Sequence, residues 1–140
     1  MSKFNELNLS PEILRAVDEM GYESATQIQS ETIPLIMDGR DVLGRSNTGT
    51  GKTAAFGIPA IERIDTNNRM PQVLIICPTR ELVTQVASEL RKFSKYKEGV
   101  KIVPIYGGQP IDGQIRLLKR GCGIVVGTPG RIMDHLKRKT

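Results

Sequence analysis

The eight-residue run SNTGTGKT, from Ser46 to Thr53, constrains this chain more than any other feature. Two glycines, Gly49 and Gly51, let successive backbone N–H groups point into one concavity, which suits anionic oxygens. Lys52 adds a mobile positive charge beside them, and the hydroxyl of Thr53 is a suitable ligand for Mg²⁺. The residue types and their order therefore predict a loop that holds phosphate groups.

The residues on either side of this loop support the prediction. The apolar run DVLG at 41–44 precedes it, and apolar residues at helical spacing follow from Ala54 to Ile64. A strand, a loop and a helix in this order aim the N-terminus of the helix at a bound phosphate. The strict phosphate-loop pattern has glycine where this chain has Ser46. A turn rich in Gly and Thr that binds nothing is the alternative interpretation.

Composition narrows the class of protein. The 140 residues are 39% hydrophobic and 25% charged, which is usual for a single soluble globular domain. No apolar run approaches the ~18 residues that a membrane span needs, and the first residues lack the apolar core of a signal peptide. We therefore expect a cytoplasmic chain with no membrane partner.

The cysteines and the histidine give no pattern for zinc. Cys77 ends the apolar run VLIIC, which predicts a buried free thiol rather than a disulfide or a metal ligand. The second cysteine, Cys122, and the one histidine, His135, do not cluster with it in the sequence. The sequence therefore offers no Cys/His group with the spacing of a zinc site.

Charge is divided unevenly along the chain. Residues 1–79 carry a net charge of −3, and residues 80–140 carry a net charge of +8. A basic half beside a phosphate-binding loop favours a polyanionic second ligand, such as a nucleic acid. Basic helix faces that contact only solvent are the alternative, and charge alone does not separate the two.

Apolar runs alternate with helical patterns along the chain. Strands are expected at 73–77, 101–105 and 123–127. Helices are expected after Ser10-Pro11, from Thr26 to Met37, at about 80–96 and 109–120, and from Pro129 onward. This alternation predicts an α/β fold with a doubly wound parallel sheet, in which ligands lie at the carboxyl ends of the strands.

The segment GYESATQIQ, from Gly21 to Gln29, is the second informative feature. Thr26 and Gln29 have the spacing of a capping box, in which each side chain satisfies the other residue's backbone N–H. Alone, the segment favours a helix cap. Beside the phosphate loop, however, it resembles the Q motif of DEAD-box RNA helicases. The resemblance implies that Gln29 hydrogen-bonds the adenine edge, that Tyr22 stacks on the adenine ring, and that Phe4 helps to hold the segment.

The phosphate loop resembles motif I of the same family. Ser46 stands where the family usually has alanine, and Ala25 stands where the Q motif often has proline. The resemblance implies that Lys52 binds the β and γ phosphates of ATP and that Thr53 binds Mg²⁺, which makes these two the catalytic residues. The nucleotide-binding residues that it implies are Phe4, Tyr22, Thr26, Gln29, Ser46, Asn47, Thr48, Gly49, Thr50, Gly51, Lys52 and Thr53.

Three short motifs follow the three expected strands and continue the resemblance. PTREL at 78–82 resembles motif Ia, Gly107-Gly108 resembles the double-glycine motif, and TPGR at 128–131 resembles motif Ib. Alone, motifs Ia and Ib are interpretable as strand-to-helix turns in which a threonine caps the helix, and the paired glycines as a plain turn. Together they imply a sequence-independent grip on an RNA phosphate backbone. The RNA-binding residues that they imply are Pro78, Thr79, Arg80, Gly107, Gly108, Thr128, Gly130 and Arg131.

The resemblance covers residues 4–136 and implies that residues 1–140 are part of an N-terminal RecA-like P-loop NTPase domain, with the Q motif at 21–29. The family's Asp-Glu-Ala-Asp strand and second RecA-like domain are not among these residues. We therefore expect the 140-residue chain to bind ATP, Mg²⁺ and RNA, to hydrolyse no ATP alone, and to self-associate through unpaired strand edges. The activity implied for the parent protein is ATP-dependent RNA unwinding. The alternatives are a DNA-directed superfamily 2 translocase and a non-enzymatic fragment that binds nucleotide or RNA.

Overall fold

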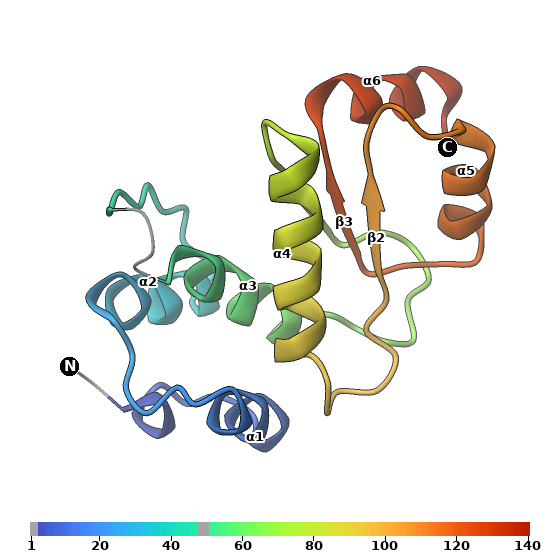
Figure 1. The fold of residues 1–140 in the computed structure, drawn as a ribbon. Coiled ribbons are helices and arrows are strands. Elements are labelled where there is room, and N and C mark those ends of the chain that lie inside the picture. The colour runs from blue at the N-terminus through green and yellow to red at the C-terminus, as the bar shows by residue number, and fades with distance from the viewer. Residues whose placement is uncertain (1–2, 48–50) are drawn as a thin grey trace. The chain divides into compact units, whose positions relative to one another are not determined.

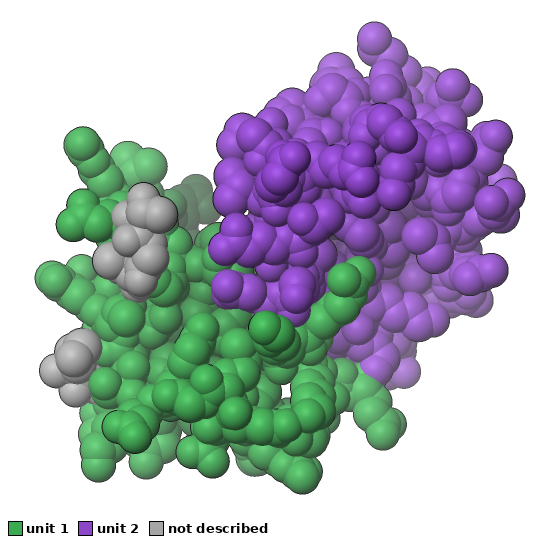
Figure 2. Space-filling view, in the orientation of Figure 1, with its two compact units in different colours: residues 1–63, 90–98 green, residues 64–89, 99–140 purple. Residues whose placement is uncertain are grey.

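A computed structural model describes residues 3–47 and 51–140 of the chain (Figure 1). The chain forms two compact units, which Figure 2 shows in different colours. Unit 1 comprises residues 1–63 and 90–98, and unit 2 comprises residues 64–89 and 99–140. The expected Q motif and phosphate loop therefore belong to unit 1, and the three expected strands belong to unit 2.

Unit 1 is helical. Its elements are the 3₁₀ helix η1 (Phe4–Glu6), α1 (Pro11–Glu19), α2 (Gln27–Met37), α3 (Lys52–Glu62) and the last residues of α4 (Arg80–Phe93). Ser10 caps α1 as predicted, because the N–H of Ile13 donates to its Oγ (3.4 Å). Ser10 also donates from its own N–H (2.9 Å) and hydroxyl (2.5 Å) to the carboxylate of Glu62. This pair of bonds ties the start of α1 to the end of α3.

Apolar faces of these helices make the core of unit 1. Its almost fully buried side chains are Ile13, Val17, Ile33, Ile58, Ile61, Leu90 and Phe93. Several are pairs three or four residues apart on one helix, the spacing that places side chains on one helix face. The predicted helix from Thr26 to Met37 is confirmed, with Thr26 as its cap, and it continues through Pro34.

Unit 2 contains a three-stranded parallel sheet. Its strands are β1 (Val73–Ile76), β2 (Ile102–Ile105) and β3 (Ile124–Gly127), arranged in the order β1-β3-β2. Val73 and Ile102 both lie opposite Ile124, so the carboxyl ends of the three strands meet at one edge of the sheet. The helices α4, α5 (Ile111–Lys119) and α6 (Pro129–Arg138) follow β1, β2 and β3 in turn (Figure 1). The predicted α/β class, the parallel sheet and its three strands are confirmed.

Side-chain burial differs between the central strand and the edge strand β1. The central strand β3 is buried along its whole length and has β1 on one edge and β2 on the other. β1 is an edge strand, and its Leu74 and Ile76 side chains are 53% and 58% exposed. One core cluster of unit 2 consists of Val103, Ile105, Cys122, Val125 and Ile132, with Leu118 packed against it.

Both cysteines are free and buried, as predicted for Cys77. Burial raises the pKa of the Cys77 and Cys122 thiols, which keeps them protonated at neutral pH. No group of three or more His, Cys, Asp or Glu side chains in the described part of the chain could hold a metal ion. Nor does any helix within the described residues have both the length and the apolar character that crossing a bilayer requires.

The strand predicted at 41–44 is wrong. Residues 40–47 belong to neither a helix nor a strand, and Leu43 is 99% exposed. A strand needs a neighbouring strand to satisfy its backbone N–H and C=O groups. The sheet that the described residues form pairs only β1, β2 and β3, so the segment before the phosphate loop has no strand partner there.

Candidate functional site

The end of the phosphate loop is built around Gly51, which is the N-cap residue of α3. Its φ of 83° lies in the left-handed region that favours glycine. A Cβ atom at this position would lie 2.2 Å from Nε2 of Gln29, so contact as well as conformation requires glycine. Lys52 and Thr53 are the first two residues of α3, and Lys52 is exposed while Thr53 is half-buried. The predicted order of loop and helix N-terminus is therefore present.

The side-chain amide of Gln29 joins the Q-motif segment to this loop. Gln29 is 3% exposed. Its Oε1 accepts from the N–H of Thr26 (3.0 Å), and its Nε2 donates to the carbonyl of Gly51 (3.1 Å). The hydroxyl of Thr26 in turn accepts from the N–H of Gln29 (3.4 Å). The predicted capping box is confirmed, and the amide that completes it also contacts the loop.

An aromatic cluster lies behind the same segment. The rings of Phe4 and Tyr22 are stacked with centroids 6.2 Å apart, and the Tyr22 ring meets Phe93 at 6.0 Å. Phe4 is 3% exposed, and the adjacent Lys3 makes an isolated bridge to Ser24. Phe4 thus contacts the segment that it was expected to hold, and Tyr22 is half-buried beside it.

A cleft of about 680 Å³ adjoins the capping box and the loop. Its lining residues are Thr26, Gln27, Ile28, Glu31, Arg45, Ser46 and Asn47. A second hollow, of about 270 Å³, is lined mainly by apolar side chains of α2 and α3 and by Lys52. The first volume is that of a typical small-molecule site. Of the predicted nucleotide residues, Thr26, Ser46 and Asn47 meet in one cleft, and Thr48, Gly49 and Thr50 lie outside the described residues.

In unit 2, the three short motifs lie at the carboxyl edge of the sheet. Thr79 caps α4 as predicted, because its hydroxyl accepts from the N–H of Leu82 (3.2 Å). The guanidinium of Arg80 lies 4.8 Å above the ring of Tyr106, the residue that directly follows β2. Motif Ia and the double-glycine segment are therefore in contact.

The double-glycine turn itself presents bare backbone. Gly107 and Gly108 are exposed, and Gly108 has a φ of 87°. A Cβ at Gly107 would meet nothing within 4 Å, so the space on that side of the residue is open. Next to the turn, Nε2 of Gln109 donates to the hydroxyl of Tyr106 (3.1 Å).

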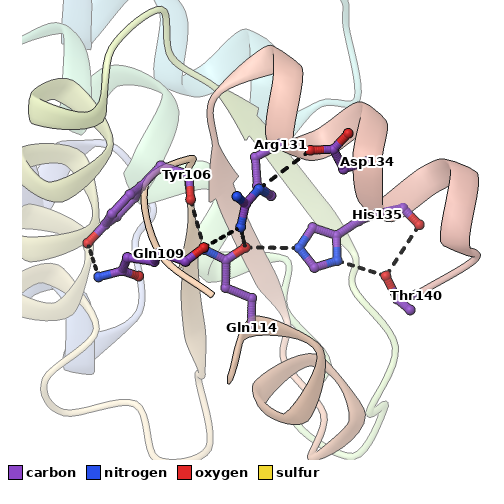
Figure 3. A network of polar contacts seen from close by, with 7 residues as sticks. All are labelled: Tyr106, Gln109, Gln114, Arg131, Asp134, His135 and Thr140. Carbon is purple, nitrogen blue, oxygen red and sulfur yellow. Dashed lines mark hydrogen bonds and ion pairs between the residues drawn. The ribbon is translucent and has the colours of Figure 1, made fainter. Parts of the chain in front are cut away.

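Arg131 is engaged with other residues of unit 2. Its Nη1 donates to the carbonyl of Gln109 (3.0 Å) and to Oε1 of Gln114 (3.2 Å), as Figure 3 shows. Its Nε lies 3.6 Å from the carboxylate of Asp134, and only 14% of its side chain is exposed. The arginine of motif Ib thus joins α6 to the residue after the double glycine.

Thr128 was expected to cap α6, and it does so by position but not through its side chain. It is the N-cap residue, but its side chain makes no capping hydrogen bond. Its N–H donates to the carbonyl of Ile105 (3.1 Å), and its own carbonyl accepts from the N–H of Ile132 (3.0 Å). Backbone bonds to β2 and along α6 therefore fix this residue without its hydroxyl.

Sequence reasoning missed two polar residues, Gln114 and His135, which are 3% and 4% exposed. Nε2 of His135 lies 3.0 Å from Oε1 of Gln114, and its Nδ1 lies 2.7 Å from the hydroxyl of Thr140. Burial lowers the pKa of His135, and the charge of Arg131 lowers it further. A signal was present, because Gln114 is a polar residue on the helix face that also carries Ile111 and Leu118.

These features define the class of protein. In this α/β chain a helix begins at a glycine-lysine-threonine loop, and ligands of such folds lie at the carboxyl ends of the parallel strands. This is the layout of a P-loop protein. A family model described as DEAD/DEAH box helicase matches residues 26–140. The chain belongs to the DEAD/DEAH box helicase family.

Its relatives agree with that membership. The chain is 54% identical over 140 residues to DEAD-box ATP-dependent RNA helicase CshA of Bacillus cereus, covering all of this chain and 26% of the relative. It is 53% identical over 137 residues to ATP-dependent RNA helicase DeaD of Klebsiella pneumoniae, covering 98% of this chain and 21% of the relative. The chain thus spans about a quarter of the length of these relatives.

A solved structure is similar over nearly the whole fold. The crystal structure of a DEAD box protein from the hyperthermophile Methanococcus jannaschii matches with a TM-score of 0.93 and 46% identity. The match covers 99% of this chain and 38% of that one. The RecA-like fold expected from the resemblance is therefore confirmed.

Proposed function

We propose that this chain is the ATP- and RNA-binding part of an ATP-dependent RNA helicase that acts in the cytoplasm. The observation that carries the proposal is the bond between Gln29 and Gly51, because it links the segment expected to read adenine to the loop expected to hold phosphate. Two of its relatives are named as ATP-dependent RNA helicases, which supports the same function.

Adenine recognition follows from the hydrogen-bonding capacity of Gln29. A side-chain amide has two N–H donors and an oxygen with two lone pairs. The bonds to Thr26 and Gly51 use one of each, which leaves one donor and one acceptor for a ligand. Adenine offers the matching donor and acceptor in its N6–H and N7, whereas guanine offers two acceptors, O6 and N7. The amide therefore favours adenine, with Tyr22 against the ring and Phe4 behind it.

The phosphates and the metal ion fit the start of α3. Lys52 is exposed at the first helical position, where a mobile ammonium and the positive end of the helix both favour the β and γ phosphates. The hydroxyl of Thr53 is an oxygen ligand of the kind that Mg²⁺ accepts, alongside phosphate oxygens and water. Bound there, Mg²⁺ would neutralise phosphate charge during ATP hydrolysis.

RNA binding is assigned to the carboxyl edge of the sheet in unit 2. Of the predicted RNA-binding residues, Pro78, Thr79, Arg80, Gly107, Gly108 and Gly130 are exposed, and Thr128 and Arg131 are half-buried. These groups offer amides, hydroxyls and a guanidinium, which reach phosphates and sugars rather than base edges. Binding should therefore be independent of sequence.

Calorimetric titration with ADP and GDP tests the nucleotide site. The chain should bind ADP about fivefold more tightly than GDP, because guanine cannot satisfy both remaining groups of Gln29 and one lost hydrogen bond is about 1 kcal/mol. Lys52→Ala should abolish measurable binding of either nucleotide. Gln29→Glu, which keeps an acceptor for Thr26 but loses the amide donor, should remove the preference for ADP.

Lys92→Ala, at an exposed lysine of α4, is the matched charge control. Equal affinities for ADP and GDP in a well-folded chain would refute the adenine assignment.

We also propose that the 140-residue polypeptide self-associates through β1. An edge strand with exposed apolar side chains, here Leu74 and Ile76, presents unpaired backbone groups to a second copy. Light scattering should show an apparent mass that rises with concentration, and Leu74→Lys should suppress the rise. A constant monomeric mass would remove this proposal without affecting the nucleotide site.

A further inference from the structure

We propose that Gln114 is a positioning residue for RNA binding, which fixes the double-glycine turn through Tyr106 and Arg131. The inference rests on the proposed RNA-binding function of that turn. Gln114 belongs to none of the motifs that resemble known RNA-binding segments, and it is 3% exposed. It therefore acts through the residues that it holds.

The amide of Gln114 joins three elements of unit 2 (Figure 3). From α5, its Nε2 donates to the carbonyl of Tyr106 (2.9 Å) at the end of β2. Its Oε1 accepts from Nη1 of Arg131 (3.2 Å) and lies 3.0 Å from Nε2 of His135, both in α6. In the tautomer that carries the proton on Nε2, His135 donates to this oxygen, and the two donors together use both of its lone pairs. A flipped amide would turn its NH₂ group toward the guanidinium, so only one orientation suits these partners.

These bonds reach the turn from both sides. The Tyr106 carbonyl that Gln114 holds lies directly before Gly107. The Gln109 carbonyl that Arg131 holds lies directly after Gly108, and Oε1 of Gln114 accepts from the same nitrogen of Arg131. Gln114 thus contacts one flank of the turn itself and supports the other through Arg131.

The turn needs such support because its own residues supply none. Neither glycine has a side chain to pack, and a Cβ added at Gly107 would meet nothing within 4 Å. A free glycine loses more conformational entropy than any other residue when it is ordered. If the turn were unrestrained, RNA would have to order it on binding, which would weaken the affinity roughly tenfold for one residue.

The contacts of Arg131 favour a positioning role for it as well. Its Nη1 serves two protein acceptors, and its Nε is buried beside Asp134. Arg80, by contrast, is exposed on the same edge and stacks on Tyr106 with its guanidinium. The structure thus assigns phosphate contact to Arg80 and support of the turn to the pair of Gln114 and Arg131.

The test uses the 140-residue polypeptide and a fluorescent single-stranded oligouridylate, with affinity measured by anisotropy. Gln114→Leu should weaken binding roughly tenfold at fixed salt, with the slope of log K against log salt unchanged, because Gln114 is neutral and touches no phosphate. Gln114→Glu, which keeps both acceptor bonds but loses the donor to Tyr106, should fall between wild type and Gln114→Leu. Gln72→Leu is the matched control. That glutamine also bonds backbone, at Asp65, but it precedes β1 at the opposite edge of the sheet.

A second readout needs no RNA. In ¹H–¹⁵N spectra of ¹⁵N-labelled protein, the amide peaks of Gly107 and Gly108 should shift or broaden in Gln114→Leu and stay in place in Gln72→Leu. Thermal melts identify any variant that fails to fold, and Gln114→Glu then carries the test. The double variant Gln114→Leu/Arg131→Ala should bind no more than about twofold more weakly than the worse single variant, because both changes release one turn.

The outcomes separate this inference from the proposed function. Unshifted glycine peaks with affinity within twofold of wild type, or fully additive losses in the double variant, would overturn the role of Gln114. A wild-type chain that binds no RNA, while its glycine peaks still respond to Gln114→Leu, would overturn the proposed function and leave the support of the turn standing.

Discussion

Each unit of the molecule holds a glycine turn with a buried glutamine, and the two glutamines differ in one informative respect. Gln29 bonds the carbonyl of Gly51 in unit 1, and Gln114 bonds the carbonyl before Gly107 in unit 2. Both are 3% exposed. A turn that offers its backbone to a ligand has no side chain of its own to hold it, so both units supply an amide from a neighbouring helix.

The difference lies in the hydrogen-bonding capacity that remains. The oxygen of Gln29 accepts one bond, from Thr26, whereas the oxygen of Gln114 has partners in both Arg131 and His135. Gln29 therefore keeps an acceptor and a donor for a ligand, and Gln114 keeps no acceptor. The comparison teaches that a buried amide with a spare donor and a spare acceptor can pair with both kinds of group on a ligand, whereas one whose oxygen is saturated cannot.

The largest expected effect is on the rate of ATP hydrolysis. It tests whether unit 1 only binds the nucleotide or also hydrolyses it. The 140-residue polypeptide should hydrolyse ATP more slowly than a full-length polypeptide, meaning one that also carries a second RecA-like domain with an arginine finger. The factor should be on the order of 10³ or more, because an arginine finger alone contributes about 10³–10⁵ in related nucleotidases. Ground-state binding by the phosphate loop lowers no barrier by itself. Phosphate release with and without RNA should be measured for both polypeptides.

Lys52→Ala in the full-length polypeptide should reduce RNA-stimulated hydrolysis to background, and Lys92→Ala should leave it unchanged. The claim that the 140-residue polypeptide binds ATP without hydrolysing it would be refuted if it showed RNA-stimulated hydrolysis that disappears with Lys52→Ala. Unit 1 would then hold catalytic groups beyond those that bind the nucleotide.

Much of this layout could be predicted from the sequence, because local patterns encode it. Apolar runs gave the three strands, the Ser10-Pro11 pair gave the start of α1, and the spacing of Thr26 and Gln29 gave the capping box. Each of these depends on residues that are neighbours in the chain. The bond from Gln29 to Gly51 spans 22 residues, and no local pattern contains it.

The wrong and the missing predictions concern features that depend on residues far apart in the sequence. The apolar run at 41–44 has strand character, but strand formation depends on a partner that the run does not encode. Gln114 meets Arg131 and His135 across 17 and 21 residues, so its role appears only when α5 and α6 come together. Thr128 has the right residue type for a cap, yet backbone bonds fix it instead.

A smaller effect distinguishes Arg80, which is expected to contact a phosphate, from Gln114, which is expected to position the double-glycine turn. Arg80→Ala should make the slope of log K against log salt less steep by roughly 0.7, the value for one phosphate contact on single-stranded nucleic acid. Arg80→Lys should keep the slope, because it keeps the charge. Arg138→Ala removes an exposed arginine at the other end of α6 and is the matched control.

ADP affinity should be unchanged in Arg80→Ala, Arg80→Lys and Arg138→Ala, since both arginines lie outside unit 1. The assignment of this edge to phosphate contact would be refuted by a strong preference for one oligonucleotide over its scrambled sequence that persists at high salt. Base contacts, which the exposed groups of unit 2 are not expected to make, would then be needed.

The smallest expected effect concerns the pH dependence of stability in unit 2. Burial lowers the pKa of His135 in the folded chain below its usual value of 6.5, with Arg131 and Arg138 lowering it and Asp134 opposing them. The unfolded chain therefore binds the proton more readily. The contribution of neutral His135 to the free energy of unfolding is fully present above pH 6.5. It is lost as the pH falls through the folded-state pKa. His135 is the only histidine of the chain, and histidine is the side chain whose usual pKa lies in the range of pH 5.5 to 7. The melting temperature of wild type should fall across this interval as the pH is lowered, and His135→Gln, which keeps a donor for Gln114, should fall less. An equal fall in both proteins would show that His135 is not the group responsible. The wild-type fall should also be independent of ADP, because the nucleotide site belongs to unit 1 and the histidine to unit 2.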